Sequence, residues 1–266
     1  MSKGPVLLKL GGSLITDKNR PHTARMDVLE RLAGEIAQAC AQDAGLRIVL
    51  GHGSGSFGHV PASKYHTRQG VKSAKEWNGF VEVWREADEL CRLVMQSLEN
   101  ARLPALRLPP SAMVIARQGQ VESWDLGTLQ QALGRGLLPV IHGDVAFDRV
   151  LGGTILSTED LFTYLAEQLH PTRILLAGTE PGVWADYPHN THLLPEITPQ
   201  SFARIEAGLG GSASTDVTGG MADKVRRVIA MVQASQGISA CIFSGEQPGN
   251  VHRALLGETL GTEIHV

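Results

Sequence analysis

The sequence predicts an α/β fold in which helices cover both faces of a mainly parallel sheet. Short apolar runs followed by glycine recur along the whole chain, and segments with helical periodicity separate them. A strand buried on both faces is typically such a continuous apolar run. Strands that alternate with helices indicate a parallel sheet, so the two observations together predict this class.

Five apolar runs are the expected strands, namely Val6–Leu10, Arg47–Leu50, Leu137–Ile141, Arg173–Ala177 and Ala240–Phe243. The helices expected between them are Met26–Gln42, Lys75–Asn100, Thr158–His170 and Ala222–Gln236. Ligands of parallel sheets bind at the carboxyl ends of the strands, so the glycines, histidines and lysines there should share one edge. Gly208–Gly220 is expected to be a ligand loop because it leads directly into a helix with Lys224 in its first turn.

Length and composition limit the class of protein. The 266 residues fit one domain or two closely joined lobes, and 42% apolar with 19% charged residues favours a globule. A net charge of −3 provides no basic field for nucleic acid, so any phosphate site must be local. The apolar run before Gly11 is short and interrupted by Lys9, which argues against a signal peptide or membrane span and favours the cytoplasm.

Neither a disulfide nor a protein-bound zinc ion is expected. Cys40, Cys91 and Cys241 lie far apart, form no CxxC pair and show no metal-ligand spacing, so reduced thiols are predicted. His52 and His59 also lack a partner at the helical spacing of a zinc site. The sequence therefore predicts no metal site made by the protein itself.

The first chemical motif is Lys9-Leu10-Gly11-Gly12-Ser13, directly after the first strand. Glycines let backbone N–H groups approach phosphate oxygens, and Lys9 would supply a positive charge. A tight turn alone would also explain this motif. Lys18 follows nine residues later and is either a second cation for a transferring phosphoryl group or an ordinary surface lysine.

A second glycine-rich motif, Gly51 to His59, follows the second strand. It contains four glycines, two serines and two histidines. A structural turn needs only one or two glycines, so this density predicts a nest of N–H donors for an anion. His59 would add a side-chain donor.

Two shorter motifs each have two interpretations. His142-Gly143-Asp144-Val145 ends the third strand and is either a catalytic histidine–aspartate pair or a turn in which Asp144 caps a helix. Ser157-Thr158-Glu159-Asp160 begins a helix and resembles a capping signal. Its carboxylates could instead orient the lysines of a phosphate site.

The C-terminal half contains two further motifs. Gly178 to Asp186 follows the fourth strand and could form a turn that frames a flat ring such as adenine. Gly219-Gly220-Met221-Ala222-Asp223-Lys224 places a lysine at a helix start, where its charge opposes the helix dipole and calls for an anion such as a nucleotide phosphate. The Walker, dinucleotide-binding and protein-kinase motifs are all missing from the sequence, so a kinase of this kind would belong to another lineage.

Taken in order, these motifs resemble those of the amino acid kinase superfamily, and within it the isopentenyl phosphate kinases. The narrower resemblance rests on Ile15-Thr16-Asp17-Lys18 and on Ser56-Phe57-Gly58-His59. It implies an open three-layer αβα sandwich, usually a homodimer, that phosphorylates isopentenyl phosphate with ATP and with Mg²⁺ carried by ATP. The acceptor is expected in residues 1–150 and the nucleotide in residues 151–266 of a single domain.

The resemblance also implies a role for each matching residue. Phosphoryl transfer is expected to depend on Lys9, Lys18, His59 and Lys224. ATP is expected to meet Lys9, Gly11, Gly12, Ser13, Gly55, Thr179, Gly182, Asp186, Gly220 and Lys224. The acceptor phosphate is expected to meet Ser54, Gly55, His59, Gly143 and Asp144. Glu159 and Asp160 are expected to orient the lysines.

The sequence departs from the family pattern in two places. Ser54 stands where the middle of three successive glycines is common, and its Cβ could narrow the approach of the acceptor. Glu159-Asp160 replaces the usual pair of aspartates, which leaves open which carboxylate orients the lysines.

An aromatic stripe follows the histidine-containing motif. Trp77, Phe80, Val81 and Trp84 are spaced as one apolar face of a helix. Ordinary core packing would explain this pattern, but we expect Trp77, Phe80 and Trp84 to contribute to a wall for the isoprenoid tail. Three basic residues nearby would suit an amino acid acceptor instead: Arg68, Lys72 and Arg85.

Two alternatives therefore remain open. The first is another small-molecule kinase on the same scaffold, with a carboxylate, carbamate or phosphonate as acceptor. The second is a nucleotide-binding regulator that has lost catalysis. The presence of Lys9, Lys18, His59 and Lys224 together argues against the regulator.

Overall fold

The computed structural model describes residues 4–206, 220–235 and 237–266. Its main sheet has the strand order β12-β14-β13-β9-β1-β2-β6-β3. All neighbouring strands are parallel except β13 and β14. The strands of this sheet are β1 (Val6–Leu10), β2 (Ile48–His52), β3 (Ala105–Arg107), β6 (Leu138–His142), β9 (Arg173–Gly178), β12 (Glu196–Ile197), β13 (Ser239–Ser244) and β14 (Thr262–Ile264).

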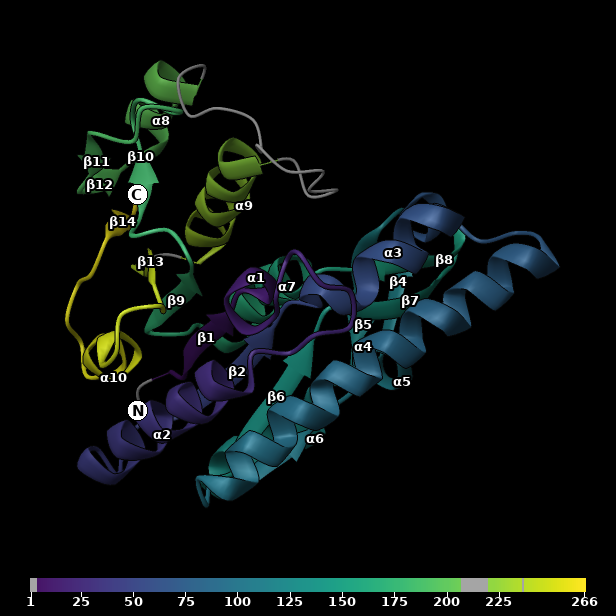
Figure 1. Cartoon of the computed structure of the whole chain (residues 1–266), viewed down its shortest axis with the longest axis horizontal. Helices are drawn as coiled ribbons and strands as arrows, with labels where there is room; N and C mark the ends of the chain where they lie inside the picture. The colour runs from purple at the N-terminus through teal and green to yellow at the C-terminus, as the bar shows by residue number, and fades with distance from the viewer. Residues whose placement is uncertain (1–3, 207–219, 236) are drawn as a thin grey trace.

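Helices cover both faces of the sheet, which confirms the predicted fold class. One face packs against α2 (Met26–Gln42), α4 (Ala74–Asn100) and α10 (Asn250–Leu255). The other face packs against α6 (Gly127–Gly134), α7 (Thr158–Leu169) and α9 (Gly220–Ala234). Neighbouring residues of β1 point to opposite faces, so Leu7 joins one core and Leu8 joins the other. Figure 1 shows α2 and α4 running side by side.

The expected helices and strands match the structure closely, with small differences at their ends. Helix α2 has the predicted bounds, and α4 begins one residue early. Helix α7 ends at Leu169 because His170 adopts a left-handed conformation with a φ of 45°. Strands β2 and β6 extend to His52 and His142, beyond the predicted strand ends.

Several features were not predicted, including three strands of the main sheet, β3, β12 and β14. Part of the expected loop between Gly51 and His59 is helical, because α3 (Gly55–Tyr65) begins inside the glycine-rich motif. A second sheet, with the order β5-β4-β7-β8, connects Gly143 to the start of α7. Its strands are β4 (Val114–Arg117), β5 (Gln120–Trp124), β7 (Asp144–Asp148) and β8 (Gly152–Leu156). A two-stranded ribbon joins β10 (Val183–Trp184) to β11 (Leu193–Leu194).

Two further observations concern membrane-spanning helices and the predicted ligand loop. Within the described residues, no helix combines the length and apolar character needed to cross a membrane. Most of the predicted ligand loop Gly208–Gly220, including Gly219, lies outside the described residues.

Gly182→Ala should lower the free energy of unfolding by about 1–3 kcal/mol, because the added Cβ would overpack a filled contact. This Cβ would lie 2.6 Å from Thr262 Oγ1, which accepts the Val183 N–H. Gly34→Ala is the control, since nothing lies within 4 Å of its added Cβ inside α2. It should raise stability by about 0.5–1 kcal/mol. Urea unfolding of both variants measures this, and unchanged stability in Gly182→Ala would contradict the packing argument.

Candidate functional site

Two glycine turns touch at the carboxyl ends of β1 and β2. A Cβ on Gly12 would lie 2.7 Å from the Gly55 Cα, and one on Gly53 would lie 2.8 Å from the Gly12 nitrogen. Gly55 also has a φ of +51°, which side chains disfavour. Thr16 ties the turns together, since its Oγ1 donates to the Gly12 carbonyl and accepts the Ser56 N–H. The two turns therefore form one continuous backbone surface.

This surface presents N–H groups that have no acceptor in the described parts of the chain. They belong to Gly12, Ser13, Ser54 and Gly55. The nearby N–H groups of Gly11, Gly53 and Gly143 are already bonded to carbonyl oxygens. The unbonded groups lie at the starts of α1 (Gly12–Ile15) and α3. Free N–H groups at helix starts form a site for an anion.

Two lysines and one carboxylate lie at the same edge of the sheet. Lys9 of β1 contacts the carboxylate of Glu159, in the first turn of α7. Lys224 of α9 reaches the end of β9, since a Cβ on Gly178 would lie 3.9 Å from its Nζ. Burial alone would raise the pKa of Glu159, but the Lys9 ammonium, with help from Lys224, lowers it to about 2. Glu159 is therefore ionised across the physiological range.

Asp160 makes different contacts from Glu159. Its carboxylate accepts the Ser157 N–H in a capping box at the start of α7. It also pairs with Arg68 at 2.9 Å and with Arg227 at 2.7 Å. Arg68 lies in the 3₁₀ helix Thr67–Gln69, and Arg227 lies in α9. The capping interpretation thus holds for Asp160, whereas Glu159 is the carboxylate that contacts Lys9.

The residues expected at the nucleotide have local structural contacts. The Thr179 carbonyl accepts the Ser244 hydroxyl at 3.2 Å. Asp186 accepts N–H groups of Thr191 and His192, and its bonds to Thr191 and His192 lower its pKa to about 2. These contacts explain why an aspartate stands at position 186 without invoking a ligand. Packing against β14 likewise explains the glycine at position 182. Gly220 begins α9 with a φ of 77°. Nucleotide binding by these residues stays a prediction.

Asp144 lies beneath the acceptor edge and is only 1% exposed. Its carboxylate accepts N–H groups of Val145 and Ser111, and its Oδ2 lies 3.6 Å from His142 Nε2. Burial raises the pKa of Asp144 to about 6. Asp144 begins β7 and is not the N-cap of a helix, so the capping interpretation is wrong; it instead accepts an N–H group in the first turn of α5 (Pro110–Met113). Its predicted contact with the acceptor, like that of Gly143, stays a prediction.

The aromatic stripe on α4 divides between two environments. Phe80 is buried and lies 5.2 Å from the Trp77 ring and 5.5 Å from the Phe147 ring. Trp84 is 38% exposed, so it does not share the buried environment of Phe80. Phe147 of β7 was missed because the five residues of this strand show no clear alternation of apolar and polar side chains. We call Trp77, Phe80 and Phe147 the aromatic cluster.

Two further residues were expected to act in catalysis, Lys18 and His59. Lys18 is exposed in the turn between α1 and α2. The backbone of His59 lies in α3, but its side chain is outside the described part of the protein. Their roles stay predictions.

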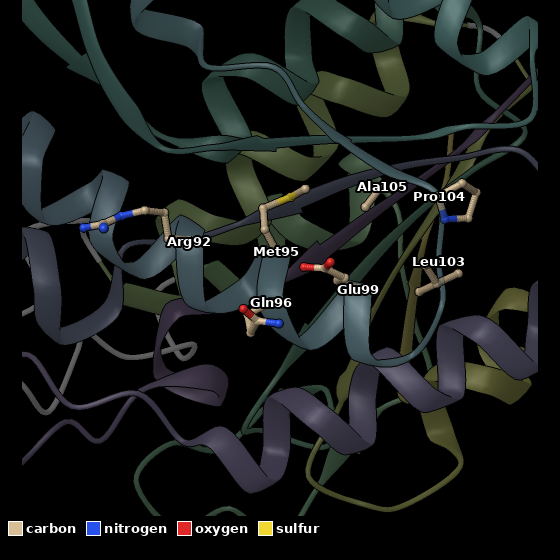
Figure 2. Close-up of a pocket in the computed structure, with 7 residues that line it drawn as sticks. All are labelled: Arg92, Met95, Gln96, Glu99, Leu103, Pro104 and Ala105. Carbon is tan, nitrogen blue, oxygen red and sulfur yellow. The ribbon is translucent and has the colours of Figure 1, made fainter.

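A surface depression of about 500 Å³ lies at the other end of the sheet (Figure 2). Residues from the last turns of α4 and from the loop before β3 line it, including Glu99 and Ala105. Ala105 is the first residue of a parallel strand, so this depression faces the amino edge. It is thus separate from the candidate site at the carboxyl edge.

The chain is similar to characterised proteins along nearly its full length. The model of the amino acid kinase family matches residues 4–244. An isopentenyl phosphate kinase of Methanocaldococcus jannaschii is 35% identical over 97% of each chain. One from Haloferax volcanii is 36% identical over 93% of this chain and 98% of its own.

A solved structure supports the same grouping. The X-ray structure of an isopentenyl phosphate kinase superposes with a TM-score of 0.81 at 30% identity, covering 97% of this chain and 99% of that one. The motifs, the fold and these relatives agree across the whole length. The chain therefore belongs to the amino acid kinase family and, within it, to the isopentenyl phosphate kinases.

Proposed function

We propose that this protein transfers the γ-phosphoryl group of ATP to isopentenyl phosphate and forms isopentenyl diphosphate. The main support is the surface of unbonded N–H groups at Gly12, Ser13, Ser54 and Gly55, which lies at the end of the strand that carries Lys9. Full-length relatives with this name support the choice of acceptor.

The charges at the site suit an acceptor that needs no general base. A base works best when its pKa lies near the working pH, whereas Glu159 has a pKa of about 2. Asp144 has a pKa of about 6, but it is buried and its oxygens accept the N–H groups of Val145 and Ser111. A hydroxyl acceptor would need such a base, but a phosphate monoester is already mostly dianionic near neutral pH. The N–H groups and lysines would instead hold the two phosphates in line and offset their repulsion.

ATP and Mg²⁺ fit the residues present. Lys9 and Lys224 would meet the β- and γ-phosphates, and Lys18 would add positive charge in the transition state. Within the described residues, no group of three acidic side chains gathers at this edge. Mg²⁺ would therefore be held mainly by phosphate oxygens, where it offsets their charge. In this proposal residues 1–150 bind the acceptor and residues 151–266 bind the nucleotide.

The aromatic cluster supports an isoprenoid tail. Phe147 lies three residues along β7 from Asp144, or roughly 10 Å at about 3.3 Å per residue. Its side chain is 52% exposed, which is unusual for a phenylalanine in contact with two other aromatic rings. An apolar tail that extends from the acceptor phosphate along β7 would approach this ring.

We also propose a homodimer in the cytoplasm, as the family resemblance implies. Sedimentation equilibrium of the purified protein would test the dimer, and fractionation of cells would test the location.

A panel of acceptors provides the main test of the proposed function. Purified protein with ATP and Mg²⁺ should phosphorylate isopentenyl phosphate, with lower kcat/KM for geranyl phosphate and no turnover of glutamate or carbamate. Detection of ADP and of the diphosphate product measures this. Turnover of an amino acid or a phosphonate alone would favour the first alternative. Tight ATP binding without turnover of any acceptor would favour the regulator.

Glu159→Gln should lower kcat by roughly 100-fold, because Lys9 loses the charged partner that fixes its ammonium group. The KM for ATP should change less. Asp160→Asn is the matched control, since it alters the adjacent carboxylate and should mainly lower stability, by about 1–3 kcal/mol. Steady-state kinetics and thermal unfolding of both variants measure this. Equal losses of kcat would contradict the separate roles of the two carboxylates.

Trp77→Ala should raise the KM for isopentenyl phosphate by about 10-fold, because it removes apolar contact with the tail. The KM for ATP should stay unchanged. Trp84→Ala, on the same helix but away from the buried ring, tests whether the wall extends to the exposed part of the stripe. If neither variant alters the KM of any prenyl phosphate, the aromatic stripe does not bind the tail.

Lys18→Ala and His59→Ala test the two catalytic roles that rest on the family resemblance. In the same assay, loss of Lys18 should lower kcat more than it raises KM. Loss of His59 should weaken acceptor use and leave ATP affinity intact. Equal weakening of both substrates in His59→Ala would contradict its assignment to the acceptor.

A further inference from the structure

Three buried side chains with metal-binding atoms meet just beneath the acceptor edge. His52 ends β2, His142 ends β6, and Cys91 lies in the middle of α4. Each is at most 1% exposed. One ligand atom from each lies within 4.8 Å of the other two. The histidines are direct neighbours across two parallel strands, so the sheet itself holds them together.

Three of the four imidazole nitrogens of this cluster lack a hydrogen-bond partner among the described residues. His52 Nδ1 lies 3.1 Å from the Gly53 carbonyl, so this nitrogen carries the hydrogen and donates it. His52 Nε2 then presents a lone pair, and it has no partner within the described protein. Both nitrogens of His142 are also without a partner there. Buried polar atoms are rarely left unbonded, so these three nitrogens call for an explanation.

The pattern at His52 is that of a metal ligand. A histidine that binds a metal usually donates its other ring N–H to a carbonyl or carboxylate, which fixes the tautomer. A cation would also satisfy the lone pairs that the protein leaves open. Two imidazoles and a thiolate are typical ligands of zinc and other borderline-soft ions.

We propose that His52, Cys91 and His142 bind one transition-metal ion of the zinc type. The Asp144 carboxylate borders this group, with its Oδ2 3.6 Å from His142 Nε2, but it already accepts the N–H groups of Val145 and Ser111. A divalent ion with one thiolate ligand keeps one positive charge, which the neighbouring Asp144 carboxylate would offset. Arg107, the nearby cation, is already paired with Asp88.

Binding requires a rearrangement of the two histidine rings. The two rings are nearly parallel, at 9° with centroids 5.4 Å apart, so their lone pairs do not yet converge. Ligands of a tetrahedral zinc ion lie roughly 3.3–3.8 Å apart, given bonds of about 2.0–2.3 Å. Since the ligand atoms lie within 4.8 Å of one another, the cluster would contract by at most roughly 1–1.5 Å. The His142 ring can turn toward the ion without losing a hydrogen bond, because it makes none within the described protein.

The position of the ion gives it a structural role. Gly53 and Gly143 directly follow the two histidines, and Cys91 lies on the helix that also carries Trp77. A bound metal would connect both acceptor turns to α4 from below. It would take no part in phosphoryl transfer.

Cobalt binding by the full-length protein tests the proposal directly. The protein is first freed of metal with a chelator and then titrated with Co²⁺, which reports a thiolate ligand through intense near-ultraviolet absorption. Wild-type protein should bind one Co²⁺ per chain with this absorption, and added Zn²⁺ should displace it. Because this readout needs neither ATP nor acceptor, it is independent of the proposed kinase activity.

Matched cysteine variants identify the ligand. Cys91→Ser should lose the absorption and bind Co²⁺ at least 10- to 100-fold more weakly. Cys241→Ser is the control, because Cys241 is equally buried but lies in β13 against the Leu260 carbonyl. Cys241→Ser should keep both the absorption and the Co²⁺ affinity. Circular dichroism would show that each variant is folded. Wild-type protein without the absorption, or Cys91→Ser with it, would overturn the proposal.

Discussion

The contact between the turns at Gly12 and Gly55 is the constraint on which the rest of the site depends. Each turn follows a parallel strand, and the strands are neighbours, so the backbones approach until no Cβ fits between them. This contact directs the first N–H groups of α1 and α3 toward the same space. A larger residue at either position would separate the donors and also displace Thr16, which links the turns.

Much of the fold was predictable because strong local patterns determine it. The apolar runs and helical periods predicted the central strands and gave the bounds of α2 correctly. The second sheet was missed because its strands are short and mix polar with apolar residues. Helix α3 was missed because glycine and proline disfavour helices, whereas packing against α4 stabilises one here.

The candidate site, like the fold, could be predicted from the sequence only in part. The motifs located Lys9, the glycine turns and the carboxylates, since these residues follow strand ends directly. The sequence could not show whether Glu159 or Asp160 contacts Lys9, because this depends on the direction in which each side chain leaves α7. The cluster of His52, Cys91 and His142 has no sequence signature at all. Its members come from three elements, and only the register of β2 with β6 and the packing of α4 bring them together.

The first turn of α7 shows how one short segment serves two purposes. Adjacent residues on a helix point about 100° apart, so Glu159 and Asp160 cannot face the same partner. Glu159 turns toward Lys9, while Asp160 pairs with Arg68 on one side and Arg227 on the other. Arg227 belongs to the helix that carries Lys224. The ion pairs of Asp160 therefore fix α9 relative to α7, and they set the distance between Lys224 and the carboxylate that contacts Lys9.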